Sequence, residues 1–350
     1  MSTAVVSLTK NGAKLALEIG QKLQADTYIK EEFMEQYVPN ENPLRVIPIA
    51  ENFASLVKKI FHSHDALVFV MACGIVVRSI APYIKDKSTD PAVVVVDEKG
   101  KHAISLLSGH LGGANRLAVQ VAAVTGGTPV ITTATDVNQV TAFDLFAVEN
   151  DCAIENLKEL KYISGALVNG EKVALHTDCS MEGAIPENIV PEESGLSCGV
   201  LLTNSTEQQA EEKHVLKLRP RNLILGIGCR KGVTAEAIEE AVEDFLQKNG
   251  KSILSVKYLA SIELKKDEQG IRAFCEKRQI PFVTLTAQKL QQVEDRCSTS
   301  HFVKQTVGVG SVSEACAIAA EEEARLLCGK TVYKGITLAL AQIGRTYRFY

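Results

Sequence analysis

The sequence predicts an α/β protein in which two mainly parallel-sheet α/β domains are separated by a smaller, acidic α/β middle domain. Short apolar runs at residues 66–71 and 92–96 have the composition of strands that are covered on both faces. Segments with helical character alternate with such runs in both outer parts of the chain, which favours parallel sheets flanked by helices. Acidic residues concentrate between them, because residues 136–218 contain 15 Asp or Glu but only 5 Lys.

The first predicted domain spans residues 1–135. Its further expected elements are a helix at 74–81 that ends before Pro82, a strand at 103–107, a helix at 114–125 and a strand at 129–133. A glycine cluster stands directly before the helix at 114–125. This order of strands and helices predicts a mainly parallel sheet with helices on both faces.

The middle domain is predicted at 136–218 and the last domain at 219–350, with a linker at 217–222. Residues 142–148 and 173–175 are the expected short strands of the middle domain. The last domain is expected to contain a strand at 223–227, a helix at 235–247 capped by Thr234, a strand at 280–285, a helix at 312–327 and a strand at 335–342.

Charge and cysteine content argue against several classes of protein. The net charge is −4, so a nucleic-acid partner has no overall electrostatic support, although the segments outside 136–218 together carry +6. No apolar stretch approaches the length of a membrane span, and the first residues lack the pattern of a signal peptide. We therefore expect a cytoplasmic location. Nine scattered cysteines, none in a C-x-x-C pair, predict reduced thiols and argue against a zinc knuckle, and no protein-bound metal is expected.

The strongest local signal is the glycine-rich segment at 105–115. Glycines at a strand-to-helix junction let a ligand approach the backbone closely, and free N–H groups at a helix start can hold an anion. His110 lies inside this segment, where an imidazole can act as a general base near neutral pH or bond a backbone carbonyl. The candidate residues here are two catalytic ones, His110 and Ser108, and four ligand-binding ones, Gly109, Gly112, Gly113 and Asn115.

Two more glycine-rich junctions lie in the last domain. Residues 226–232 follow an expected strand, and Gly228, Arg230 and Lys231 supply backbone amides and positive charge for an anion. The spacing matches neither the dinucleotide fingerprint nor the phosphate loop, so tight strand-to-helix packing is the alternative. Residues 308–314 repeat the pattern. Plain capping of the next helix by Ser311 or Ser313 is the favoured interpretation, and Ser311 is also a candidate ligand contact.

Two cations and two thiols complete the candidates. Arg78 and Lys87 lie near each other in the sequence and can pair with acidic ligand groups. Cys73 has apolar neighbours, which favour an inert thiol, whereas Cys229 lies beside cations and is the more reactive candidate.

Several long motifs resemble those of the cobalamin-biosynthesis CbiG family. In the first domain these are ACGIVVRSIAP at 72–82, KDKSTDPAVVVVD at 85–97, ISLLSGHLGGAN at 104–115 and VITTATD at 130–136. In the last domain they are LGIGCRKG at 225–232 and VGVGSVSEA at 307–315. The resemblance covers most of the chain, and a form fused to a methyltransferase domain is not expected.

The resemblance implies an enzyme that opens the δ-lactone of cobalt-precorrin-5A and releases C20 with its methyl group as acetaldehyde. Cobalt then belongs to the substrate, and no cofactor is expected. His110 is expected to activate water, the amides of residues 109–113 to hold an oxyanion, and Arg78, Lys87, Arg230 and Lys231 to pair with substrate carboxylates. The partner is a small cobalt-corrinoid, while a homodimer and transient contacts with other corrin-pathway enzymes stay open.

Two other functions remain as alternatives at this point. One is a carrier that binds a corrinoid intermediate without changing it, and the other is a nucleotide-dependent enzyme that uses the glycine loops for phosphate. Binding of a coloured tetrapyrrole, compared with binding of ATP or NAD, distinguishes these classes.

Overall fold

The computed structural model describes residues 2–37, 45–86, 89–191, 195–298 and 310–349. The chain divides into two compact units, Met1–Leu145 and Phe146–Tyr350, which are described one at a time. Within the described residues, no helix is both long and apolar enough to cross a membrane.

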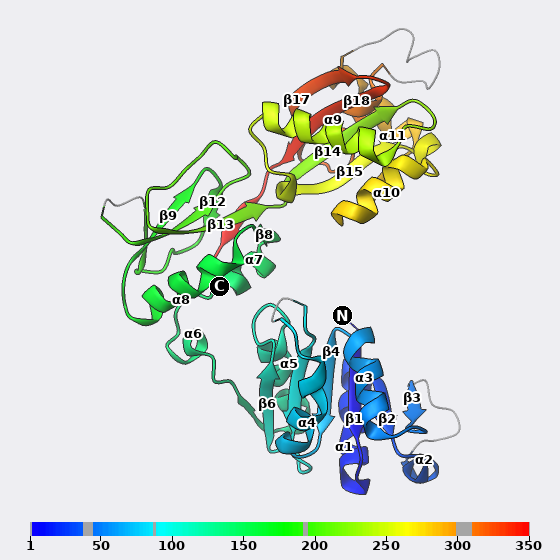
Figure 1. Cartoon of the computed structure of the whole chain (residues 1–350), viewed down its shortest axis with the longest axis vertical. Coiled ribbons are helices and arrows are strands. Elements are labelled where there is room, and N and C mark those ends of the chain that lie inside the picture. Colours follow the sequence, from blue (N-terminus) through cyan, green and yellow to red (C-terminus); the bar gives the residue numbers. More distant parts are fainter. Residues whose placement is uncertain (1, 38–44, 87–88, 192–194, 299–309, 350) are drawn as a thin grey trace. The chain divides into compact units, whose positions relative to one another are not determined.

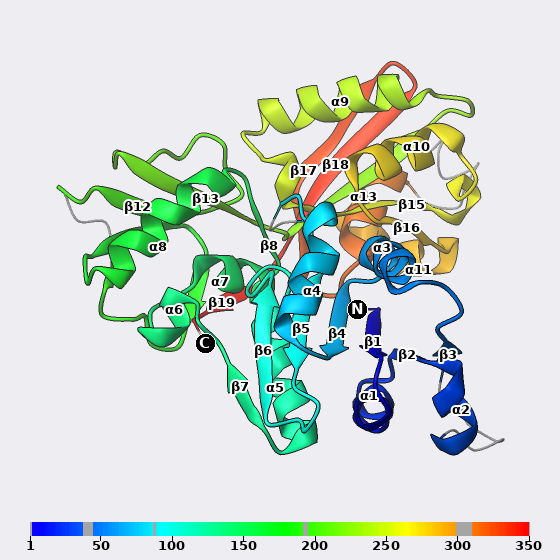
Figure 2. The ribbon, with the colours of Figure 1, turned by 60° about the horizontal axis from the view of Figure 1, so that its bottom comes forward.

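The first unit is built on a seven-stranded sheet with the order β3-β2-β1-β4-β5-β6-β7 (Figures 1 and 2). Neighbouring strands are parallel except β5 and β6, which run antiparallel. The strands are β1 (Thr3–Ser7), β2 (Asp26–Ile29), β3 (Val46–Pro48), β4 (Ala66–Val70), β5 (Ala92–Val96), β6 (His102–Leu107) and β7 (Thr128–Val130). The helices are α1 (Lys10–Leu23), α2 (Glu31–Tyr37), α3 (Phe53–Ser63), α4 (Cys73–Ile80), α5 (Ala114–Thr125) and α6 (Ala134–Val137), and α7 (Phe143–Glu149) follows.

Strand β4 shows why this sheet needs helices on both faces. All five of its residues are buried. Val68 packs in a core cluster with side chains of α1 and α5, whereas Leu67 and Phe69 pack in another with side chains of α3 and α4. Since side chains alternate along a strand, an uninterrupted apolar run places hydrophobic groups on both faces. The predicted α/β class with a mainly parallel sheet is confirmed here.

The second unit holds two five-stranded sheets and one parallel strand pair, β10-β19. The first sheet has the order β11-β9-β12-β13-β8 and is parallel except where β8 meets β13. Its elements are β8 (Cys152–Ile154), α8 (Leu160–Val168), β9 (Val173–Thr177), β11 (Ile189–Pro191), β12 (Cys198–Leu202) and β13 (His214–Pro220). The separate pair joins β10 (Ser180–Glu182) to β19 (Thr346–Arg348) near the end of the chain.

The second sheet of this unit has the order β16-β15-β14-β18-β17. Its strands are β14 (Leu223–Cys229), β15 (Val256–Ile262), β16 (Phe282–Leu285), β17 (Ala324–Tyr333) and β18 (Ile336–Ile343). The helices α9 (Ala235–Lys248) and α10 (Gln269–Arg278) pack in one core cluster with it, and α11 (Ala287–Gln291) and α13 (Val312–Ala319) pack in the other. Figure 2 shows α9 next to β17 and β18.

Three sequence-based expectations are wrong in detail. Residues 142–148 were expected as a strand, but Phe143–Glu149 is helical, and Phe143, Phe146 and Ala147 are buried at the i, i+3, i+4 spacing of a helix face. The helix expected at 312–327 ends at Ala319, and the chain turns into β17 at Ala324.

The linker expected at 217–222 is also largely absent, because β13 continues to Pro220 and β14 starts at Leu223. Arg219 is only 2% exposed and donates to the carbonyl oxygen of Thr203 at 3.1 Å, so its backbone and side chain are part of the packed unit. The division of the chain into domains 1–135, 136–218 and 219–350 stays a prediction.

Candidate active site

The glycine-rich segment forms a tight loop between β6 and α5. Ser108 and Gly113 both have positive φ angles, of 56° and 88°. A Cβ atom on Gly112 would lie 2.4 Å from the Cβ atom of Ser108 and 2.8 Å from its carbonyl oxygen. Since no real side chain fits at that distance, the loop requires glycine at position 112, and the positive φ favours glycine at position 113.

Part of the predicted anion site is already used inside the loop. The amide of Gly113 donates to the carbonyl oxygen of His110 at 3.0 Å, and the amide of Ala114 donates to that of Ser108 at 3.1 Å. The amide of Asn115 donates to the carbonyl oxygen of Gly109 at 3.0 Å. Only the amides of residues 109–112 therefore remain as candidate oxyanion donors.

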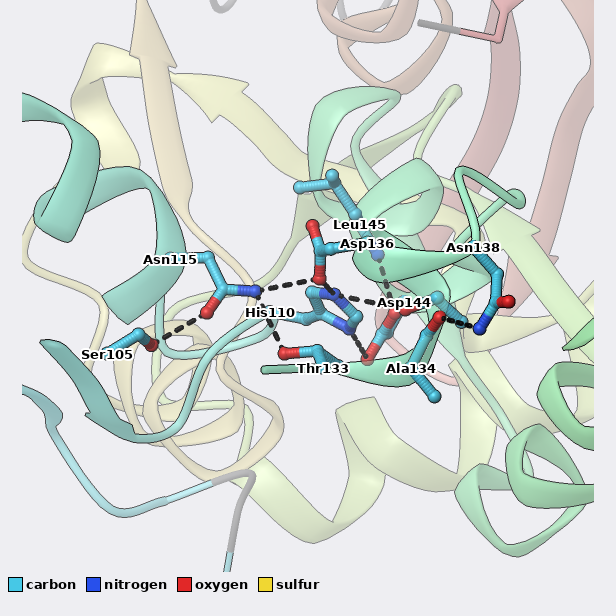
Figure 3. Close-up of polar contacts among 10 residues, drawn as sticks. Ser105, His110, Asn115, Thr133, Ala134, Asp136, Asn138, Asp144 and Leu145 are labelled. Atoms are coloured by element: carbon cyan, nitrogen blue, oxygen red, sulfur yellow. Dashed lines mark hydrogen bonds and ion pairs between the residues drawn. The ribbon is translucent and has the colours of Figure 1, made fainter. Parts of the chain in front are cut away.

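His110 lies between two carboxylates of the same unit (Figure 3). Its Nε2 is 2.8 Å from Oδ2 of Asp136, and its Nδ1 is 3.2 Å from Oδ2 of Asp144. The side chains of His110 and Asp144 are 10% and 11% exposed, whereas that of Asp136 is 34% exposed. Asp136 is thus the member of this trio that solvent or a ligand reaches most easily.

The two carboxylates keep the imidazole protonated. The hydrogen bond with Asp144 is the main cause that raises the pKa of His110 to about 9; burial opposes the rise, and Asp136 adds to it. Burial by itself would raise the pKa of Asp144, but the hydrogen bond and the positive charge of His110 bring it below its ordinary value. At neutral pH His110 is therefore a proton donor in this arrangement, rather than the base near neutrality that the sequence suggested.

Asn115 extends the trio into a polar network. Its Nδ2 donates to Oδ2 of Asp136 at 3.0 Å and to Oγ1 of Thr133 at 3.2 Å, while its Oδ1 accepts from the Ser105 hydroxyl at 2.6 Å. A Cβ atom on Gly109 would lie 2.7 Å from that Oδ1, so glycine at position 109 makes room for the asparagine. The predicted residues His110, Gly109 and Asn115 are thus brought together.

Sequence reasoning missed both carboxylates of the trio. Asp136 follows the TTAT segment and precedes the end of α6, and its position in the VITTATD motif was the available signal. Nothing in the sequence marked Asp144 as a site residue, because residues 142–148 were expected to form a strand of the middle domain.

The hydroxyl of Ser108 points to a structural partner. It donates to the carbonyl oxygen of Asp90 at 3.0 Å, which ties the glycine loop to the start of β5. In this position Ser108 anchors the loop, and its catalytic role stays a prediction.

Arg78 and Lys87 are not brought to the trio by any contact that the structure describes. Arg78 is exposed in the last turn of α4, with its guanidinium group close to Gly74. Lys87 lies outside the described residues. Both remain predicted substrate contacts.

The four candidates of the last predicted domain lie in the second unit: Gly228, Arg230, Lys231 and Ser311. Gly228 and Arg230 line a cavity beside β14, whereas Lys231 lines a different hollow. The Gly232 amide of the same loop donates to Oε1 of Glu268 at 2.6 Å, so a carboxylate of the chain itself occupies part of the expected anion site.

Ser311 precedes α13 and is 1% exposed, but its side chain does not cap that helix. The plain capping that the sequence favoured is therefore not observed. Its role as a ligand contact stays a prediction.

All nine cysteines are free thiols in the structure. Burial raises the pKa of the Cys229 thiol, which makes it less reactive than its cationic neighbours suggested. Within the described residues, no group of three or more His, Cys, Asp or Glu side chains is placed to hold a metal ion.

The fold and the trio define an α/β protein equipped for acid–base chemistry on a small molecule. Three family models match consecutive parts of the chain: cobalamin synthesis G N-terminal at 55–136, the cobalamin biosynthesis central region at 141–220 and cobalamin synthesis G C-terminus at 223–341. The chain belongs to the cobalamin synthesis G (CbiG) family, which confirms the resemblance.

Similar proteins extend over almost the whole chain. A cobalt-precorrin-5A hydrolase of Salmonella typhimurium is 35% identical and the alignment covers 97% of each chain. A cobalt-precorrin-5A hydrolase of Priestia megaterium is 33% identical, over 97% of this chain and 94% of the relative. A solved structure of a cobalamin biosynthesis protein G homolog from Sulfolobus solfataricus is 23% identical, with 97% of both chains covered and a TM-score of 0.41.

Proposed function

We propose that this chain is a hydrolase that opens the δ-lactone of cobalt-precorrin-5A and releases C20 with its methyl group as acetaldehyde, giving cobalt-precorrin-5B. The observation that carries the proposal is the full-length similarity to two curated cobalt-precorrin-5A hydrolases, at 35% and 33% identity. The chain is accordingly an enzyme of cobalamin biosynthesis. The first unit offers acid–base groups that such a reaction requires.

The reaction sets three chemical requirements. Water must be activated at the acyl carbon, the resulting oxyanion needs hydrogen-bond donors, and the departing oxygen needs a proton. The water hydroxyl joins the acyl carbon, the acyl–oxygen bond breaks, and the lactone oxygen stays on C20. The hydroxyl on C20 then loses its proton, and its oxygen becomes the carbonyl oxygen of acetaldehyde. At the same time the bond from C20 to the macrocycle breaks. The electron pair of this bond stays on the macrocycle, which takes up a proton.

Asp136 is the group that we assign to water activation. Its Oδ2 accepts hydrogen bonds from His110 and Asn115, whereas its Oδ1 has no hydrogen-bond partner within the described residues. The carboxylate is also the most exposed group of the trio. A carboxylate held at one oxygen and open at the other can accept a proton from water.

His110 is the group that we assign to proton donation. Asp144 holds its Nδ1, and its raised pKa keeps the ring charged at neutral pH. The imidazolium gives a proton to the departing oxygen, and Asp136 then returns to the imidazole the proton that it took from water. The amides of residues 109–112 are the proposed oxyanion donors, with Gly112 allowing the tight turn.

The proposal needs no resident cofactor, because cobalt enters with the substrate. We also propose a cytoplasmic enzyme whose ligand is the small cobalt-corrinoid, with Arg78, Lys87 and Arg230 as candidate carboxylate contacts. No nucleic acid or membrane takes part. A homodimer and transient contacts with other corrin-pathway enzymes are further proposals.

The decisive experiment incubates the purified chain with cobalt-precorrin-5A and traps acetaldehyde by its reduction with alcohol dehydrogenase and NADH. We expect one acetaldehyde per lactone opened, with loss of the signal in Asp136→Asn. His102→Asn is the matched control, because His102 is an exposed histidine at the other end of the strand that leads to the loop. Binding of the substrate without acetaldehyde release would instead indicate a carrier.

A further inference from the structure

The second unit contains a cavity of about 410 Å³ at one end of the strands of its last sheet. The lining includes Cys229 at the end of β14 and Ile262 at the end of β15, which is parallel to β14. From β14 the chain builds β15 and β16 on one side and later adds β18 and β17 on the other. The cavity thus lies outside the carboxyl ends of the parallel strands β14 and β15, where ligands of open α/β sheets commonly bind, and the antiparallel strand β18 begins beside it at Ile336.

The inner wall of this cavity is apolar. Ile262, Val312 and Ile336 line it. Leu264 and Val332 line it as well, although 74% and 70% of their surfaces are exposed. Single exposed aliphatic residues are common, but here two of them line the same apolar cavity, where a ligand can cover both. The volume lies within the range of about 300–1,000 Å³ that is usual for small-molecule sites.

The polar part of the lining is mainly cationic. Arg230 and Lys330 both line the cavity, and within the described residues neither side chain has a carboxylate partner. Lys265 also lines it, but is paired with Glu268 at 3.1 Å. Elsewhere in this unit partly exposed cations do find partners, as Lys257 does with Glu321 at 2.9 Å.

Hydrogen bonds hold the backbone of Arg230 and Lys330. The amide of Arg230 donates to the carbonyl oxygen of Gly335 at 2.8 Å, and the amide of Lys330 donates to Oε1 of the buried Glu314 at 2.8 Å. Glycine at position 228 lets β14 pack closely against Thr337, because a Cβ atom there would lie only 2.7 Å from the Thr337 hydroxyl oxygen. The positions from which the two cationic side chains start are therefore fixed by backbone hydrogen bonds.

We infer that this cavity binds the edge of a flat apolar molecule that carries at least two carboxylates, with Arg230 and Lys330 pairing with those carboxylates. The apolar wall packs against the edge of the ligand's ring, and the two cations form ion pairs with the ligand's carboxylates. The polycarboxylate macrocycle of the proposed function meets this description, so the identity of the occupant rests on that function. The ligand chemistry itself rests on the cavity.

The test uses the full chain and uroporphyrin, a metal-free tetrapyrrole with eight carboxylates, as the probe. We expect saturable quenching of its fluorescence, and Lys330→Gln should weaken binding about tenfold, which corresponds to about 1.4 kcal/mol. Leu264→Ser tests the apolar wall and should also weaken binding. Lys289→Gln is the matched control, since it removes the same charge from an exposed position of α11 outside the lining.

Three results would overturn the inference: no saturable binding, equal affinities for Lys330→Gln and Lys289→Gln, or displacement of the probe by ATP at similar concentration. Thermal melts of each variant confirm that the fold is retained. The acetaldehyde assay separates this inference from the proposed function. If the chain binds uroporphyrin through Lys330 but releases no acetaldehyde, the binding site is supported and the proposed hydrolase function is wrong. If the chain releases acetaldehyde but its binding of uroporphyrin does not depend on Lys330, the hydrolase function is supported and the binding site is wrong.

Discussion

Oδ2 of Asp144 lies 3.2 Å from Nδ1 of His110, whose other ring nitrogen lies 2.8 Å from Asp136. Both ring nitrogens must carry a proton to donate to both carboxylates, which agrees with the raised pKa of His110. The contact also joins the glycine loop to the first turn of α7. His110 therefore has a charge-stabilised structural contact in addition to its proposed role in the reaction.

Replacing His110 should lower kcat strongly. We expect His110→Ala and His110→Asn to reduce kcat by about 10²- to 10⁴-fold, the usual range for an acid–base group. Asparagine keeps a hydrogen bond but cannot donate and recover a proton near pH 7. Steady-state acetaldehyde release, with His102→Asn as control, measures the effect. A His110→Asn variant with nearly normal kcat would contradict the catalytic role.

The stability that His110 contributes should depend on pH. Because its folded-state pKa, about 9, lies above the ordinary 6.5, the contribution is fully present below pH 6.5 and is lost as pH rises through 9. The size is on the order of 3 kcal/mol, since one pKa unit corresponds to about 1.4 kcal/mol. The same contact depresses the pKa of Asp144, so this stability also requires the ionised carboxylate: it is present above pH 3.8 and is lost as pH falls through the folded-state pKa of Asp144.

Thermal melts of the native chain and of His110→Asn measure this pH dependence. The difference in Tm between them should be largest near pH 5–6 and shrink towards pH 10. A difference that stays constant from pH 6 to pH 10 would show that the ion pair does not stabilise the fold.

The sequence predicted the elements whose signals are local. The apolar runs gave β4 and β5, and Thr234 marked the start of α9, where its hydroxyl accepts from the Ala237 amide at 3.3 Å. Residues 142–148 were assigned wrongly because a short apolar segment fits a strand and a helix equally well. Burial of Phe143, Phe146 and Ala147, which decides between them, comes from tertiary packing.

The candidate site was predictable only in part for the same reason. His110 and Asn115 lie in one glycine-rich loop, so their proximity follows from the sequence. Asp136 and Asp144 are 26 and 34 residues away from His110. Their approach depends on how α6 and the start of α7 pack against the loop, and this packing reverses the protonation state expected for the histidine.

Adding a methyl group to the loop should disturb both stability and turnover. In Gly112→Ala the new Cβ would meet backbone and side-chain atoms of Ser108 below 3.0 Å, so the loop must shift. We expect a lower Tm and a kcat reduced at least about tenfold, because misplaced catalytic groups are costly. Gly165→Ala in α8 is the control, since nothing lies within 4 Å of its Cβ position, and it should stabilise by about 0.5–1 kcal/mol. Normal activity and Tm in Gly112→Ala would contradict this account of the loop.

Turnover should not depend on an added metal. Within the described residues, no cluster of His, Cys, Asp or Glu is arranged for a metal ion, and the proposed steps use only protons and water. Dialysis against EDTA should leave kcat unchanged when the substrate already carries its cobalt. Loss of activity that zinc restores would refute the proposed metal-independent mechanism.

Arg230 and Lys231 should differ in their effect on substrate binding, although they are adjacent in the sequence. Arg230 lines the apolar cavity together with Lys330. Lys231 lines a different hollow of about 770 Å³, whose lining also includes the acidic residues Glu236, Asp267 and Glu268. A carboxylate that approaches Lys231 therefore meets like charges, whereas one that approaches Arg230 meets a second cation.

We accordingly expect Arg230→Ala to raise KM about tenfold with little change in kcat, because pairing with a carboxylate is similar in the ground and transition states. Lys231→Ala should change KM by less than about twofold, as is usual for an exposed charge. Initial rates over a range of cobalt-precorrin-5A concentrations, at constant ionic strength, measure both parameters. Equal increases in KM would show that the whole loop binds the substrate. A collapse of kcat in Arg230→Ala would place the loop in the chemistry itself, because an interaction made only in the transition state lowers kcat without raising KM.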